Sequence, residues 1–157
     1  MKHTSNSTKE TAEIAKKLAS RISRKDGPCV IGLSGELGAG KTTFAKNFAK
    51  ALGVKETVKS PTYILMRKHE IRNPKSETNS KFKKNKFKTL YHLDVYRINN
   101  TKEILDLDWK DLIKDKNNII LVEWAENIKK AFPKTHFWLN FEHAEKNKRK
   151  IEVLDKN

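Results

Sequence analysis

The apolar and polar positions along the chain alternate between two periods. Residues 8–24 carry apolar side chains at helical spacing, and Ser7 and Glu10 at the start of this segment have the pattern of a capping box. The fully apolar run 119–122 is instead typical of a buried parallel strand. Elements of both kinds alternate from end to end, which indicates an α/β fold.

The same reading assigns the remaining elements. The predicted helices are residues 8–24, 43–52, 101–106, 108–115 and 125–131, and the predicted strands are residues 29–33, 62–69, 90–98, 119–122, 135–142 and 149–154. Segments 62–69 and 87–98 should form an antiparallel pair, because one long loop joins them. We therefore expect a single three-layer domain over residues 1–157, with a mostly parallel sheet and one antiparallel strand pair.

Charge adds a question about partners. The chain has 34 Lys and Arg against 19 Asp and Glu, a net charge of +15, and residues 72–88 form a low-complexity basic stretch predicted to be a flexible loop. A nucleic-acid partner would explain this charge. The excess of Lys over Arg, with many Asn and Ile, is also what an A/T-rich coding sequence produces, so charge alone does not establish such a partner.

Composition also predicts the compartment. The first twenty residues are polar and charged, and no apolar run approaches the length of a membrane span. A single cysteine allows no internal disulfide, which agrees with a reducing environment. We expect a cytoplasmic protein with no membrane partner.

One motif carries the chemistry. Residues 35–42 spell the phosphate-binding loop G-x-x-x-x-G-K-T between a predicted strand and a predicted helix, which is the context that this motif requires. Backbone amides and the helix N-terminus would bind phosphate, Lys41 would reach the β- and γ-phosphates, and the Thr42 hydroxyl would ligate Mg²⁺. The predicted phosphate-loop residues are Glu36, Leu37, Gly38, Ala39, Gly40, Lys41, Thr42 and Thr43. The chain is therefore predicted to have a P-loop NTPase-like sheet and to bind a nucleoside triphosphate.

Two acids could serve the metal of this nucleotide. Glu123 ends the apolar strand 119–122, so its carboxylate should emerge at the carboxyl edge of the sheet, where ligands bind. There it could hold Mg²⁺ directly or through water, orient the attacking water, or be only a polar strand end. Asp94 should share a strand face with His92 and Tyr96, which suggests a site.

Four segments follow one another along the chain: the phosphate loop, Val58-Lys-Ser-Pro-Thr-Tyr63, His92-Leu-Asp-Val-Tyr-Arg97 and Val122-Glu-Trp124. Together they resemble the TsaE family, small bacterial ATPases of tRNA threonylcarbamoyladenosine synthesis. The resemblance covers nearly the whole chain, and the last three segments are its specific part. It implies a cytoplasmic ATPase that joins the TsaB and TsaD transferase pair, with only an indirect relation to tRNA, and whose cofactors are ATP and Mg²⁺.

The resemblance also implies roles for single residues. Lys41, Asp94, Glu123 and Thr62 are the implied catalytic residues, with Thr42 and Glu123 as Mg²⁺ ligands and Thr62 in a switch loop. Thr8, Arg149 and Trp124 are implied to lie at the nucleotide. The chain departs from the family pattern at Asp108, where the family has glycine, and in the long basic stretch 72–88.

Two other functions fit the motifs less well. A phosphate-loop kinase of small molecules shares the loop, but it needs an Arg-rich lid that is not evident in this sequence. A nucleic-acid-binding module could use Lys81 to Lys88, with Phe82 and Phe87 stacking on bases, although a solvated loop explains these residues equally well.

Overall fold

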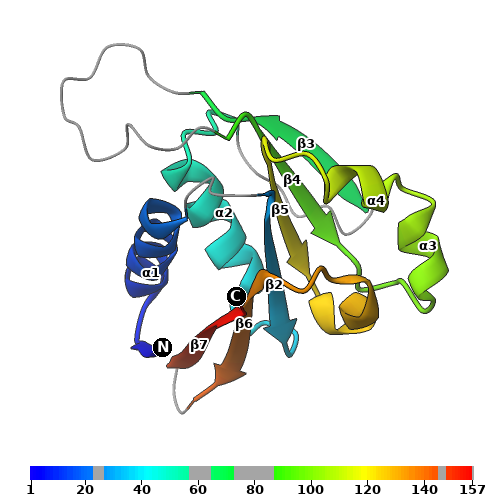
Figure 1. Cartoon of the computed structure of the whole chain (residues 1–157). Helices are drawn as coiled ribbons and strands as arrows, with labels where there is room; N and C mark the ends of the chain where they lie inside the picture. Colours follow the sequence, from blue (N-terminus) through cyan, green and yellow to red (C-terminus); the bar gives the residue numbers. More distant parts are fainter. Residues whose placement is uncertain (23–26, 57–64, 73–86, 145–147, 157) are drawn as a thin grey trace.

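A seven-stranded sheet with helices on both faces forms the part of the chain that the computed structural model describes, residues 1–22, 27–56, 65–72, 87–144 and 148–156 (Figure 1). The helices are α1 (Thr8–Arg21), α2 (Lys41–Ala51), α3 (Thr101–Leu105), α4 (Trp109–Leu112) and the 3-10 helix η2 (Ala125–Ala131). The strands are β1 (Lys2–Ser5), β2 (Cys29–Gly35), β3 (Met66–Glu70), β4 (Thr89–Asp94), β5 (Asn118–Glu123), β6 (His136–His143) and β7 (Arg149–Lys156). No helix in these ranges is long and apolar enough to cross a membrane.

The centre of the sheet is parallel and its edges are antiparallel. The strand order is β1-β7-β6-β2-β5-β4-β3. Strands β6, β2, β5 and β4 run in one direction, while β3, β7 and β1 pair antiparallel. The carboxyl ends of the four central strands therefore meet at one edge, which is the edge where open α/β sheets bind ligands.

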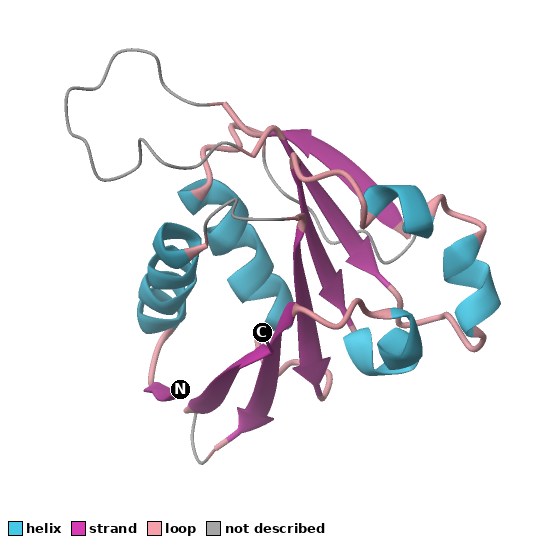
Figure 2. Cartoon of the chain, viewed as in Figure 1, coloured by secondary structure: helices cyan, strands magenta, loops and turns pink. Residues whose placement is uncertain are grey.

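Two apolar layers confirm the predicted three-layer architecture (Figure 2). Alternate residues of β2 point to opposite faces, as the strand period requires. Ile31 and Leu33 pack in the core that α1 and α2 cover, whereas Val30 packs in the core that α3, α4 and η2 cover. Strand β5 divides in the same way, and all its residues are buried.

Strand β1 was absent from the predicted elements. Its sequence, Lys-His-Thr-Ser, has no apolar alternation, and the strand forms through antiparallel pairing with β7. The following helix ends at Arg21 instead of residue 24. Ser7 caps it as predicted, but Glu10 accepts a hydrogen bond from the Asn6 amide instead of the Ser7 amide, so the capping box is not closed.

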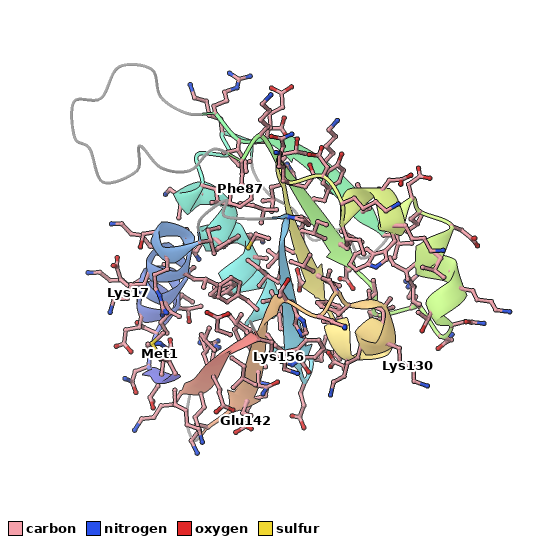
Figure 3. The ribbon with its side chains drawn as sticks, in the orientation of Figure 1. Met1, Lys17, Phe87, Lys130, Glu142 and Lys156 are labelled. Atoms are coloured by element: carbon pink, nitrogen blue, oxygen red, sulfur yellow. The ribbon has the colours of Figure 1, made fainter. Side chains whose placement is uncertain are left out.

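The flexible loop predicted over residues 72–88 does not include Phe87 and Lys88. Phe87 is fully buried in the core beside α2, and its label in Figure 3 marks that place. The Lys88 amide donates to Asn117 O at 2.8 Å, and Lys88 O accepts from the Ile71 amide at 2.9 Å. A stacking role of Phe87 on bases is therefore excluded, while residues 73–86 lie outside the described ranges.

Candidate nucleotide-binding site

The loop between β2 and α2 has the backbone that its glycines predict. Gly35, Gly38 and Gly40 have backbone φ angles of 136°, 77° and 103°, which residues with a Cβ atom rarely adopt. Gly40 caps α2, and the first helical hydrogen bond is donated by Phe44 to Gly40 O at 2.9 Å. The amides of residues 41–43 come before that bond and have no acceptor among the described residues. They are therefore available to a phosphate.

Lys41 lies inside this loop. Its side chain is buried, and its ammonium donates to Gly35 O and, at 2.8 Å, to Glu36 O. The ring of Trp124 covers the ammonium at 3.7 Å from its centroid. Burial lowers the pKa of Lys41, against the opposing pull of nearby carboxylates, first among them Glu126. A positive charge is thus held at the mouth of the loop by carbonyls and an aromatic face.

The loop glycines allow a first test. A Cβ on Gly35 would lie 2.1 Å from Phe141 O, which is backbone of the neighbouring strand β6, whereas a Cβ on Gly38 would meet nothing closer than 3.7 Å. Gly38→Ala should cost only its left-handed strain, about 1–2 kcal/mol. Gly35→Ala should be less stable still, by about 2 kcal/mol or more, or should fail to fold, because backbone cannot move aside. Chemical denaturation measures both, and equal stability of the two variants would contradict this steric account.

Glu123 connects the loop helix to the sheet edge. It is the last residue of β5, it is 1% exposed, and its Oε2 accepts a hydrogen bond from the Thr42 hydroxyl at 2.6 Å. Its other oxygen, Oε1, lies 2.8 Å from His92 Nε2. Thr42 and Glu123, the two side chains expected from the sequence to bind Mg²⁺, are therefore in direct contact.

This pair fits a magnesium ion of the kind that nucleotide enzymes use. Neighbouring ligands of an octahedral Mg²⁺ are about 2.9 Å apart, so Thr42 Oγ1 and Glu123 Oε2 need to open only slightly. Within the described residues, no group of three or more His, Cys, Asp or Glu side chains could hold a metal by itself. Mg²⁺ beside a nucleotide needs no such group, because phosphates and waters complete its shell.

Asp94 ends β4 directly beside Glu123. The two residues are register partners on neighbouring parallel strands, and Asp94 is buried. Its Oδ1 accepts a hydrogen bond from the Tyr96 amide at 3.1 Å. This bond closes a turn that ends the strand. The predicted strand to residue 98 was therefore wrong after Asp94. Tyr96 does not share a strand face with Asp94, and its exposed ring packs on Trp124 with 4.8 Å between centroids.

The hairpin of β6 and β7 reaches the loop from the other side. A Cβ on Gly40 would lie 3.0 Å from both Cδ and Nε of Arg149, so this side chain covers the start of α2. Arg149 Nε is buried with no hydrogen-bond partner among the described residues. His143 Nε2 donates to Leu37 O at 3.1 Å. Glu142, labelled in Figure 3, marks this end of β6.

Other predicted positions are spread more widely. Thr8 is exposed at the first turn of α1, three residues after Ser5, the register partner of Arg149. Thr62 and the segment around it lie outside the described ranges. Asp108, where the resemblance implies a glycine, has a left-handed φ of 56°, the conformation that favours glycine.

Two residues of the site were missed in the sequence. Glu126 Oε1 accepts from the Gly35 amide at 3.3 Å. Its carboxylate opposes the lowering of the Lys41 pKa by burial more than any other charge does. A turn after β5 brings it back to the strand edge, which its spacing of three from Glu123 could have indicated. His143 could have been found as a polar residue at the carboxyl end of a predicted strand.

Comparisons with known proteins agree on one family. The profile of the family described as "Threonylcarbamoyl adenosine biosynthesis protein TsaE" matches residues 5–151. A protein of Rickettsia typhi named tRNA threonylcarbamoyladenosine biosynthesis protein TsaE is 32% identical over 156 residues, which is 99% of this chain and 95% of that protein. A protein of the same name from Bacillus subtilis is 34% identical over 142 residues, 90% of this chain and 77% of that protein.

The fold is also similar to a solved structure. The crystal structure of Bacillus subtilis YdiB superposes with a TM-score of 0.69 and 26% sequence identity, covering 100% of this chain and 86% of that one. The likeness extends over the whole sheet and both helical layers, which confirms the predicted fold class.

Proposed function

Because the chain belongs to the TsaE family of threonylcarbamoyl adenosine biosynthesis proteins, we propose that it is the ATP-binding and ATP-hydrolysing subunit of tRNA threonylcarbamoyladenosine modification. In this proposal the protein depends on Mg²⁺ and acts with TsaB and TsaD counterparts, which carry out the transfer. It works in the cytoplasm, and any relation to tRNA is an indirect one through these partners.

One observation carries the proposal. The Thr42 hydroxyl and the Glu123 carboxylate meet at 2.6 Å beside a phosphate loop whose lysine is already in place. A glycine-rich turn without a ligand would not need both a buried cation and a buried carboxylate at its mouth, since burying charges is costly. A nucleotide and its metal would give each of these charges a partner of opposite sign.

The residues divide the chemistry as follows. Lys41 and the amides at the start of α2 bind the phosphates, while Thr42 and Glu123 are the groups that would hold Mg²⁺. The chemistry that Mg²⁺ supplies when bound is neutralisation of charge on the β- and γ-phosphate oxygens. Asp94, next to Glu123 at the strand ends, would orient the attacking water. The Arg149 side chain over Gly40 adds a second cation on the opposite side.

Two further roles complete the proposal. Trp124 keeps the Lys41 ammonium in the loop by a cation–π contact until phosphate oxygens replace the carbonyls as its partners. Thr62 as the switch residue that senses the γ-phosphate stays a prediction from the sequence, and so does contact of Thr8 with the base.

The proposal is tested by an ATPase assay with purified TsaB and TsaD counterparts. We expect slow hydrolysis by the protein alone and about tenfold or more faster hydrolysis when both partners are present, because the partners should favour the competent state. The assay should be repeated without Mg²⁺, when turnover should cease. Binding of neither ATP nor the partner pair by the folded protein would contradict the proposal.

A further inference from the structure

We propose that His92 is a positioning residue that fixes the direction of the Glu123 carboxylate toward Thr42. The inference rests on the proposed function, because it concerns the carboxylate that would hold Mg²⁺. It assigns to the buried His92 imidazole a defined task, donation from Nε2 to the Glu123 carboxylate.

The geometry uses both carboxylate oxygens. Glu123 Oε1 lies 2.8 Å from His92 Nε2, and Oε2 lies 2.6 Å from Thr42 Oγ1. A carboxylate oxygen accepts, so Nε2 carries the hydrogen and donates it. One oxygen is thus tied to the sheet and the other is turned toward the phosphate loop.

The neighbouring strands make this contact rigid. His92 lies on β4 and Glu123 on β5, and the parallel register places His92 opposite Leu121, two residues before Glu123. His92 is 0% exposed and Glu123 is 1% exposed, so bulk water does not compete for the bond. A glutamate has three rotatable bonds, and a buried donor at one oxygen removes most of that freedom.

Thr42 cannot provide this restraint by itself. Its hydroxyl is the other group that would hold Mg²⁺, and it rotates to suit its partners. Once Thr42 Oγ1 faces the metal, its hydrogen bond to Oε2 is changed, while the bond from His92 to Oε1 can remain. Carboxylates that hold metals are commonly oriented by such an outer partner.

Packing alone does not account for a histidine at this place. His92 Nδ1 is buried and has no hydrogen-bond partner among the residues that the structure describes. A buried polar atom without a partner costs free energy, and an aliphatic side chain would fill similar space without that cost. The group that distinguishes histidine here is the Nε2 donor to Glu123.

The test compares three variants with the wild-type protein. In His92→Gln the side-chain amide reaches about the position of Nε2, in His92→Asn it reaches only about the position of Nδ1, and His92→Leu has no donor. Calorimetry with a non-hydrolysable ATP analogue, with Mg²⁺ and with EDTA, gives the gain in affinity due to Mg²⁺. We expect His92→Leu and His92→Asn to lose roughly 10- to 100-fold of this gain, and His92→Gln to retain most of it. Affinity in EDTA should be similar in all four proteins.

The outcomes separate this inference from the proposed function. An unchanged Mg²⁺ gain in folded His92→Leu, or equal losses in the Gln and Asn variants, would overturn the role of His92 and leave the nucleotide site standing. If the nucleotide affinity of the wild-type protein is the same with and without Mg²⁺, both the role of His92 and the proposed function are overturned. If His92→Leu does not fold, the Gln and Asn pair decides. Nitrogen-15 NMR of the wild-type imidazole adds a direct check, because a hydrogen on Nδ1 and none on Nε2 would exclude the donation.

Discussion

Lys41→Ala should lose roughly 10²- to 10³-fold in ATP turnover while its fold remains intact. Lys41 supplies the cation fixed at the mouth of the phosphate loop, where Gly35 O, Glu36 O and the Trp124 ring hold it. Phosphoryl transfer asks little more of a protein than positioning and neutralisation of charge, so losing this cation removes a main contribution. The partner-stimulated ATPase assay measures the effect.

The fold should survive because Lys41 contributes charge more than packing. Burial lowers the pKa of the ammonium, because a charge held away from water is costly. Alanine removes that cost. Lys46→Ala, at an exposed position on the same helix, is the matched control and should keep full turnover. Wild-type turnover in a folded Lys41→Ala protein would refute the assignment of the site.

Variants at the two acids should separate binding from hydrolysis. Glu123→Gln should lose more of the Mg²⁺-dependent nucleotide affinity than the roughly 10- to 100-fold expected for an outer partner, because Glu123 itself faces Thr42. Asp94→Asn should keep most of that affinity and lose turnover, since it keeps an acceptor for the Tyr96 amide but not the charge. Calorimetry and the ATPase assay on the same preparations give the two readings.

The choice of substitutions guards against loss of structure. Glu123→Ala would leave the His92 donor buried without a partner, which costs about 1–3 kcal/mol of stability. Glu123→Gln retains one side-chain oxygen, which can accept from one of the two groups, His92 and Thr42, that donate to Glu123. A selective loss of Mg²⁺ affinity in Asp94→Asn, with normal affinity in Glu123→Gln, would reverse the roles of the two acids.

The parts of the site that sequence predicts are those that depend on local chain geometry. The phosphate loop is such a part, since glycines at fixed offsets between a strand and a helix determine its backbone. The end of β5 is another, because an apolar run followed by Glu123 places the carboxylate at the sheet edge. The contact of Thr42 with Glu123 also requires that β2 and β5 are neighbours in the sheet.

The parts that sequence does not predict depend on pairing between distant segments. The polar strand β1 exists because β7 offers it a partner. The contact of His92 with Glu123 depends on the register of β4 against β5, which a one-residue shift would destroy. The end of β4 depends on the hydrogen bond from the Tyr96 amide to Asp94, which alternation of apolar residues does not reveal.

The contact between the phosphate loop and the β6–β7 hairpin has a consequence for the synthesis of the protein. His143 and Leu37, which join across the loop, are 106 residues apart along the chain. A ribosome therefore releases the nucleotide-binding motif before its supports, with β3, β4 and β5 made in between. The motif is local in sequence, but its completed form needs a residue 106 positions later, so a nascent polypeptide would carry it unsupported until that residue has been made.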